Sequence, residues 1–404
     1  MVYKQISKIA LKKSNKMKLI HKIILSILWR TGLGKLIGSL FWKRISRGPG
    51  IQTLYRNKVE VFKSMPIDFE DKSLNEFLKT QTQKWNFQEE FVVLLKNVLV
   101  EPDRLLGIQN FNKLIEQTVV YKHAYQYPYI LPYLFNRKKI INLEQAVLYD
   151  GSASRNYYHH LVDAVSSLQV LKNIKLPVNI PYLITRKSFD TNFFQLLYNK
   201  SSVFRNINWK IIEPNEWVRV KDLYKAQALH YRKETWAHIK ILYNTVADKP
   251  YRKIFLSRDK KIYSRSLTNE SAIENLLSKY GFEKIYAEHI SIEEQEKLFA
   301  STKYLVALTG MGLVQQFFMN NYEAHIIELM PSNRKMPEYY WLAFALDIRY
   351  YDILVGTKMN KQGNYEINPA VLEKMIIKML TNTEKNLVYG NAIFDPLKNP
   401  SLEN

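Results

Sequence analysis

The second half of this chain alternates between short apolar segments with strand character and segments with helical periodicity. Strand patterns cover residues 253–256, 284–286, 304–308 and 326–329. Apolar residues recur at helical spacing over residues 273–280, and Gly281 ends that pattern. Ser291-x-x-Glu294 forms a capping box that opens the next helix. Alternation of this kind predicts a parallel sheet whose two faces are covered by helices.

The first half shows a less regular form of the same alternation. Strand patterns cover residues 146–149, 182–184, 209–212 and 222–229, and helical patterns cover residues 73–85, 91–99, 157–172, 192–198 and 230–244. Breakers at residues 47–50 and 248–250 separate these segments. We therefore expect an α/β fold with two Rossmann-like domains facing a central cleft. Residues 49–248 and 249–404 would form the domains, and residues 1–48 a basic N-terminal helical arm.

The composition limits the kinds of active site that this chain can hold. Its 404 residues are 47% hydrophobic, which is enough for sizeable cores, and they include no cysteine. Structural disulfides, thiolate metal sites and cysteine nucleophiles are therefore excluded. The three acidic side chains of residues 68–71 lie in a charged loop, and we predict neither a metal site nor a cofactor. No Ser-His-Asp grouping or G-x-S-x-G turn is visible.

The first fifty residues concentrate positive charge. They contain twelve Lys or Arg and no Asp or Glu, in a chain whose net charge is +22. The longest largely apolar run, residues 23–29, is too short to span a bilayer, and no small-residue cleavage site follows it. The large apolar side chains between the charges disfavour a nucleic-acid-binding arm. We predict an amphipathic segment on an anionic membrane surface, at the cytoplasmic face of a bacterial membrane; the alternative is a helix packed on the body.

Residues 156–163 place three polar side chains of different chemistry on one stripe of a predicted helix. Asn156, His159 and Asp163 are spaced at i, i+3 and i+7, and they follow a predicted strand and a loop. Leu161 and Val165 fall on the opposite side and would pack against a core. Open α/β sheets bind ligands at the carboxyl ends of their strands, so the stripe is a candidate site. The alternative is a solvated helix face with one capping Asn.

Two groups in the second half are typical of an anion site. The turn Gly310-Met311-Gly312 connects a buried strand to a predicted helix over residues 313–319, where backbone N–H groups can approach a phosphate. Arg258 and Arg265 follow the first strand of this half and could bind a diphosphate together. The alternatives are a tight corner for the glycines and surface ion pairs for the arginines. Those pairs would be with Asp259, Glu270 or Glu274.

The last polar candidate is a carboxylate at the end of a strand. Glu328 closes the strand pattern of residues 326–329. A carboxylate in that position can accept hydrogen bonds from ribose or sugar hydroxyls, or it can cap a neighbouring helix.

Taken in their order along the chain, these motifs resemble those of glycosyltransferase family 61. The elements are N-x-x-H-x-x-x-D at 156–163, S-R-D…R…N-E at 257–270, G-F-E at 281–283, E-E-Q at 293–295, G-x-G-L at 310–313 and I-I-E-L-x-P at 326–331. The resemblance covers residues 146–331, less than half of the chain. Two positions differ from the family's H-G-A-G-L-x-N turn, since Thr309 replaces the His and Gln315 replaces the Asn.

The resemblance implies a GT-B fold and inverting transfer from a nucleotide-sugar donor to a glycan acceptor, without an obligatory metal. It suggests a role in capsular or other surface polysaccharide synthesis, with a glycan or lipid-linked glycan acceptor. For the base it leaves two alternatives: His159 oriented by Asp163, or Asp163 itself with His159 binding the acceptor. The donor would be bound by Arg258, Arg265, Gly310, Met311, Gly312 and Glu328, with acceptor or supporting roles for Asn156, Asn269 and Glu270.

Two rival functions belong to other classes. One is a non-catalytic basic protein that binds membrane or nucleic acid. The other is a different polysaccharide-modifying enzyme, such as a pyruvyl or phosphosugar transferase. Release of a nucleoside diphosphate that depends on a nucleotide-sugar would distinguish the predicted enzyme from both.

Overall fold

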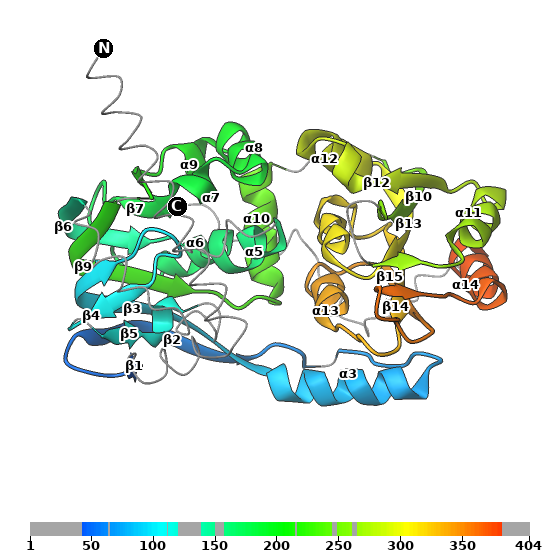
Figure 1. Cartoon of the computed structure of the whole chain (residues 1–404), viewed down its shortest axis with the longest axis horizontal. Coiled ribbons are helices and arrows are strands. Elements are labelled where there is room, and N and C mark those ends of the chain that lie inside the picture. The colour runs from blue at the N-terminus through cyan, green and yellow to red at the C-terminus, as the bar shows by residue number, and fades with distance from the viewer. Residues whose placement is uncertain are drawn as a thin grey trace, which may run out of the picture.

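The computed structural model shows a mixed α/β chain built on two large sheets (Figure 1). It describes residues 43–63, 65–110, 112–119, 139–149, 157–214, 216–244, 249–260 and 265–381. The sheets follow one another along the chain, and a small pair of strands, β11 (Ser266–Leu267) and β16 (Asn364–Tyr365), accompanies the second. No helix in the described ranges is both long enough and apolar enough to cross a membrane.

The second sheet is parallel, as the alternating sequence pattern predicts, and it contains the four predicted strands and a fifth that was not predicted, β15 (Tyr350–Gly356). Its other strands are β10 (Arg252–Ser257), β12 (Glu283–Tyr286), β13 (Thr302–Leu308) and β14 (His325–Pro331). They lie in the order β12-β10-β13-β14-β15, so the direction of winding reverses between β10 and β13. Ligands of doubly wound sheets bind beyond the carboxyl ends of the strands at such a reversal.

Helices cover this sheet, and two of their ends follow the predicted local signals. They are α11 (Glu270–Lys279), η5 (Ala287–His289), α12 (Ile292–Ala300), η6 (Met311–Phe318), α13 (Glu338–Ala345) and α14 (Pro369–Thr381). The capping box of Ser291 and Glu294 is present at the start of α12, and Gly281 has a φ of +79° just after α11. The helix predicted over residues 313–319 is the 3₁₀ helix η6.

The first sheet is mixed rather than wholly parallel. Its strands are β1 (Lys43–Ile45), β2 (Ile51–Glu60), β3 (Phe87–Val100), β4 (Gly107–Gln109), β5 (Lys113–Ile115), β6 (Lys139–Leu148), β7 (Tyr182–Thr185), β8 (Trp209–Ile212) and β9 (Glu216–Gln227). The strands β9-β6-β7-β8 are parallel, and winding reverses between β6 and β9. The other half of the sheet is antiparallel, with β3 between β2 and β9.

Two sequence predictions in this region differ from the structure. Residues 91–99, predicted as helical, lie in the middle of β3, where apolar side chains reach cores on both faces of the sheet. Within the predicted arm, Lys43–Ile45 form β1, which pairs in parallel with β5. The rest of the predicted arm, residues 1–42, lies outside the described residues.

The helices of the first half lie mostly on the side of the second sheet. They are α5 (Tyr157–His159), η4 (His160–Val165), α6 (Ser167–Leu171), α7 (Arg186–Phe189), α8 (Asn192–Lys200), α9 (Ser202–Arg205) and α10 (Lys233–Tyr243), with the short η1 (Glu116–Thr118) beside the edge strands. One continuous apolar core includes side chains from these helices and from the second half, such as Phe194, Trp236, Phe317 and Tyr340. The two halves are therefore packed through a shared core.

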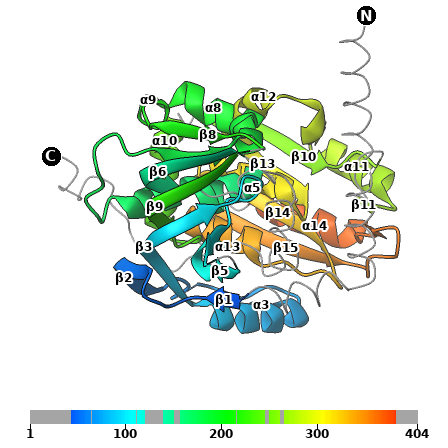
Figure 2. The same ribbon diagram turned by 60° about the vertical axis from the view of Figure 1, so that its left-hand side comes forward.

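One helix of the first half lies against the second half. The helix α3 (Lys72–Trp85) runs below α13 and the second sheet, apart from the other helices of its half (Figures 1 and 2). Trp341 Nε1 on α13 donates a hydrogen bond to Thr82 Oγ1 at 3.2 Å, and the Tyr340 hydroxyl donates to the carbonyl of Pro66. Lys335 Nζ, just before α13, donates to Ser73 Oγ at 2.8 Å. These contacts hold α13 between the two halves.

Candidate active site

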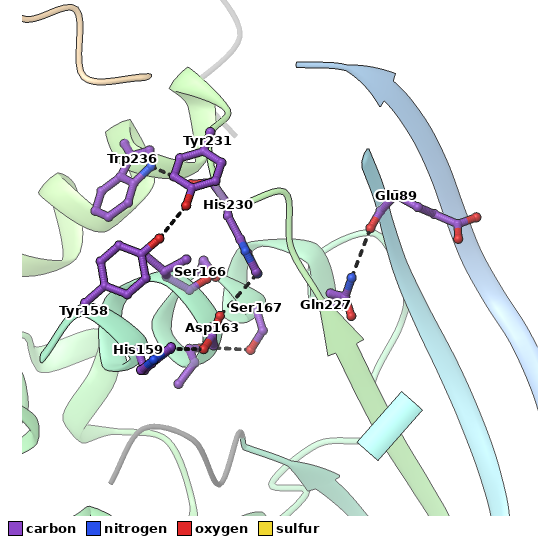
Figure 3. Close-up of polar contacts among 12 residues, drawn as sticks. Glu89, Tyr158, His159, Asp163, Ser166, Ser167, Gln227, His230, Tyr231 and Trp236 are labelled. Atoms are coloured by element: carbon purple, nitrogen blue, oxygen red, sulfur yellow. Dashed lines mark hydrogen bonds and ion pairs between the residues drawn. The ribbon is translucent and has the colours of Figure 1, made fainter. Parts of the chain in front are cut away.

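The predicted imidazole and carboxylate are paired beyond the carboxyl end of β6. His159 Nδ1 and Asp163 Oδ2 lie 2.7 Å apart, and their side chains are 24% and 11% exposed (Figure 3). The helix widens here into the π-helical segment η4, in which Ser166 N donates to Leu161 O. Such widened turns are frequent at functional sites. Asn156, the third residue of the predicted stripe, lies outside the described residues.

A second imidazole, absent from the sequence prediction, contacts the other oxygen of the same carboxylate. His230 Nε2 lies 3.4 Å from Asp163 Oδ1. His230 follows β9 directly, and Trp236 Nε1 donates to its carbonyl at 2.8 Å, which fixes this piece of backbone. Since β6 and β9 are the strands between which winding reverses, both histidines and Asp163 lie at the switch point of the first sheet.

Tyrosine side chains border this group. The hydroxyls of Tyr158 and Tyr231 are 2.5 Å apart, and Figure 3 shows the pair beside His230 and Asp163. Burial and the neighbouring Tyr231 raise the pKa of Tyr158 well above its ordinary value, and Asp163 adds to this effect. Both phenols therefore stay neutral and can act as hydrogen-bond donors.

The predicted anion site begins at the carboxyl end of β10, at the switch point of the second sheet. Arg258 Nη2 donates to the carbonyl of Thr309 at 2.6 Å, so the arginine lies across the end of the neighbouring strand β13. Gly310 has a φ of +141°, and a Cβ atom there would meet Arg258 Nη2 at 1.5 Å. A glycine is thus required both for the backbone and for the close approach of the guanidinium. Gly310 precedes η6, whose first residues are Met311 and Gly312.

Arg265 carries a charge that no described carboxylate neutralises. Its Nη1 atom is buried and has no hydrogen-bond partner among the described residues. Burial lowers the pKa of Arg265 to about 10, and the positive charges of Arg258 and Arg334 add to this effect. Like charges gathered in this way are unfavourable unless an anion joins them.

The carboxylates considered as alternative partners of Arg265 bind other groups. Glu270 accepts a hydrogen bond from Ser257 Oγ at 2.6 Å and pairs with Lys260 and Lys284 at 3.1 and 3.4 Å. Glu274 pairs with Lys284 at 2.6 Å. Asp259 pairs with His289 at 3.0 Å. None of the three carboxylates therefore pairs with Arg265 among the described residues.

The supporting residues on this side mostly bind protein groups. Asn269 Nδ2 donates to the carbonyl of Ile367 at 2.7 Å and its Oδ1 accepts from Ile367 N, which ties the start of α11 to the end of β16. Gln315, one of the two departures from the family pattern, hydrogen-bonds to Gln295 of α12. The Asn269 and Gln315 side chains therefore hold the loops and helices around the arginines in place.

Glu328 is more deeply buried than expected for a side chain that binds a ligand at the end of a strand. Its side chain is fully buried, and Tyr351 donates to Oε2 at 2.8 Å. Burial raises the pKa of this carboxyl to about 7. Glu328 therefore lies beneath the anion site, next to Thr309 and within electrostatic reach of Arg258.

Tyr339 of α13 connects the His159–Asp163 pair with the group around Arg258 and Arg265. Its ring meets that of Tyr158 edge-on at 6.1 Å, and Gln316 of η6 donates to its carbonyl at 3.1 Å. Its pKa is raised, first by burial and then by Glu328, while Arg258 and Arg265 act in the opposite direction. Tyr339 therefore touches the first group directly and lies within electrostatic reach of the second. The fold thus brings together two switch points separated by about a hundred residues of sequence.

Comparison with known proteins agrees with this arrangement. Residues 157–326 match the model of a family described as Glycosyltransferase 61. A search of curated proteins finds no match. The matched segment contains His159, Asp163, Arg258, Arg265 and the turn at 310–312, which are the residues at both switch points. This segment, which is less than half of the chain, is therefore similar to glycosyltransferase family 61.

Proposed function

We propose that this enzyme transfers a sugar from a nucleotide-sugar donor to a glycan acceptor, with inversion at the anomeric carbon. The observation that carries the proposal is the placement of a His–Asp pair and an arginine cluster at two adjoining switch points. Inverting transfer needs one base for the acceptor hydroxyl and positive charge for the leaving diphosphate. We also propose a GT-B arrangement, with the first half as acceptor side and the second half as donor side.

The geometry favours His159 as the base over Asp163. Both carboxylate oxygens of Asp163 lie against imidazole nitrogens, at 2.7 Å for His159 and 3.4 Å for His230. Asp163 can therefore hold His159 with its proton on Nδ1, which leaves Nε2 as the acceptor of a proton. In this role His159 Nε2 takes the proton of the acceptor hydroxyl while the acceptor oxygen bonds to the anomeric carbon.

The arginine cluster would receive the leaving group. As the bond between the anomeric carbon and the diphosphate oxygen breaks, negative charge grows on the diphosphate. Arg258 and Arg265 would stabilise this charge, and the N–H groups at the start of η6 would add to them. We propose that these groups do this without a metal ion. Glu328 is buried close to Thr309 and Arg258, and we propose that it acts on the donor's ribose or sugar only indirectly, through these neighbours.

The first experiment is a screen of nucleotide-sugars for stabilisation of the protein against heat, followed by an assay of nucleoside diphosphate release. We expect one base to stabilise the protein and the corresponding nucleotide-sugar to be consumed only when a glycan acceptor is present. A protein that neither binds nor consumes any nucleotide-sugar, but still binds anionic vesicles or nucleic acid, would contradict the proposal.

The biological setting is a separate proposal that rests on residues 1–42. We propose that these residues hold the enzyme on the inner face of a bacterial membrane, near a lipid-linked acceptor for capsular or other surface polysaccharide. Nine of the twelve basic residues of the first fifty lie in this segment. Deletion should stop at residue 42, because Lys43–Ile45 form β1. Flotation with anionic liposomes should fall with added salt and with this deletion; binding that persists after the deletion would contradict the proposal.

A further inference from the structure

Glu338 occupies the place where the two switch points adjoin. It is the first residue of α13, and the next residue, Tyr339, contacts Tyr158. Glu338 acts electrostatically on Tyr158 and Tyr231 of the first half and on Glu328 of the second. It belongs to none of the sequence motifs, and it lies outside the segment matched by the family model.

The carboxylate of Glu338 has an unused acceptor. Its Oε2 atom is buried and has no hydrogen-bond partner among the described residues. Burial raises the pKa of this carboxyl. A buried carboxylate oxygen without a donor is unfavourable, and native structures retain such groups chiefly where a ligand or an ion satisfies them.

Helix stabilisation does not account for this side chain. An acidic residue in the first turn favours a helix through the macrodipole, but it does so equally well when exposed to water. Exposed carboxylates at this position also avoid the cost of desolvation. Glu338 is only partly buried as a residue, but its Oε2 atom is buried without a partner, and this atom therefore indicates a function.

The direction of the reaction identifies the ligand. In the proposed transfer, the anomeric carbon lies between the base at His159 and the diphosphate at Arg258 and Arg265. The sugar ring of the donor must then occupy the junction where Glu338 lies. A carboxylate accepts hydrogen bonds from hydroxyl or amide groups of a sugar, and it repels a second carboxylate.

We propose that Glu338 binds hydroxyl or amide groups of the donor sugar and restricts the donor to sugars without a negative charge. The inference rests on the proposed function, and it adds the class of donor: neutral hexoses or N-acetylated hexosamines, in preference to uronic acids. Glu338 thereby determines specificity at the sugar, while the arginines determine affinity for the diphosphate.

The test compares binding of three ligands that share one base. They are the nucleoside diphosphate, its neutral hexose derivative and its uronic acid derivative, each measured by calorimetry at pH 8. We expect the native enzyme to bind the neutral derivative at least about tenfold more tightly than the uronic acid derivative. Glu338→Gln should reduce this difference about tenfold and leave nucleoside diphosphate affinity unchanged within about twofold.

A matched control is Glu373→Gln on α14, since Glu373 accepts a hydrogen bond from Tyr280 away from the site. That variant should keep all three affinities. Equal binding of neutral and acidic derivatives by the native enzyme would overturn the inference, as would an unchanged difference in Glu338→Gln. Failure of the native enzyme to bind any nucleoside diphosphate would instead refute the proposed function, so the two outcomes are distinguishable.

Discussion

The two switch points differ in how completely their charges are satisfied. At the first, Asp163 uses one oxygen for His159 and the other for His230. The ring nitrogens of the neighbouring His160 have no partner among the described residues, but burial lowers the pKa of this imidazole and keeps it neutral. At the second, the charged Arg265 Nη1 and the Glu328 Oε1 atom are buried without hydrogen-bond partners among the described residues, as is Glu338 Oε2 where the two switch points adjoin. Proton transfer needs groups that are already oriented, whereas an anion site needs donors that wait for a ligand. The difference supports the proposal that chemistry takes place at the first switch point and donor binding at the second.

The largest expected effect tests the first switch point. His159→Gln removes the proposed base, and turnover at saturating donor should fall about 100- to 10,000-fold, while nucleoside diphosphate affinity stays unchanged. The readout is release of nucleoside diphosphate in the presence of acceptor. His238→Gln is the control, because His238 lies beside Lys172 on another part of the first half. Retained turnover in His159→Gln would show that the base is Asp163 or another group.

The next effect concerns the second switch point. Arg265→Gln should weaken nucleoside diphosphate binding about 10- to 150-fold, equivalent to about 1.5–3 kcal/mol for a charged hydrogen bond. Turnover at saturating donor should change less than affinity. The exposed Arg219 of β9 offers a control, since Arg219→Gln removes the same charge elsewhere. Equal affinities in the two variants would show that the arginine cluster does not bind the diphosphate.

A pair of glycine substitutions separates backbone strain from ligand binding. Gly310→Ala and Gly281→Ala both place a side chain at positive φ, +141° and +79° respectively. Each should lose about 1–3 kcal/mol of stability by thermal or denaturant unfolding. Only the Gly310 variant displaces Arg258, because the nearest atom to a Cβ at Gly281 is 4.0 Å away. We expect nucleoside diphosphate affinity to fall about tenfold in Gly310→Ala alone. A loss in both variants would reveal a general effect on the fold.

The change in stability per pH unit, which is the smallest quantity to be measured, distinguishes the two regions. His160, next to the proposed base, is fully buried, and burial lowers its pKa from 6.5 to about 3. The unfolded chain therefore binds the extra proton first, and stability falls as pH drops from 6.5 toward 3. Glu328 has the opposite sign: its pKa is raised from 4.5 to about 7, so stability falls as pH rises through that interval.

Each slope is at most about 1.4 kcal/mol per pH unit and should disappear in one variant. Urea unfolding of His160→Leu should lose the acid-side slope, and that of Glu328→Gln the slope between pH 4.5 and 7. A slope that survives in its variant belongs to another group.

The sequence predicted those parts of the molecule that depend on local signals. The parallel second sheet follows from strand and helix patterns of clear period, and the capping box at Ser291 and the glycine at Gly281 fix helix ends. The helix prediction for residues 91–99 is wrong, because a largely apolar segment of this length is compatible with a buried helix or a buried strand. The β-branched residues of this segment favour a strand. The strand β3 is also long and is covered by apolar cores on both faces.

The site was predictable only where its residues lie in one local motif. His159 and Asp163 are four positions apart, and their pairing follows from helical geometry. His230 and Glu338 are distant in sequence from both, and only the topology of the two sheets brings them to the site. His230 could have been found from its place directly after the predicted strand of residues 222–229, because strand ends carry the ligand groups of parallel sheets. Glu338 had no such signal, since an acidic residue at a helix start is common.

The most direct test of the account is a crystal structure of the enzyme with a bound nucleoside diphosphate. The account predicts that the phosphate oxygens lie within hydrogen-bond distance of the Arg258 and Arg265 guanidinium groups, at the carboxyl ends of β10 and β13. The terminal phosphate should face Glu338 and, beyond it, His159. Phosphates bound at another sheet edge, or at the His–Asp group of the first sheet, would contradict the division of labour between the two switch points.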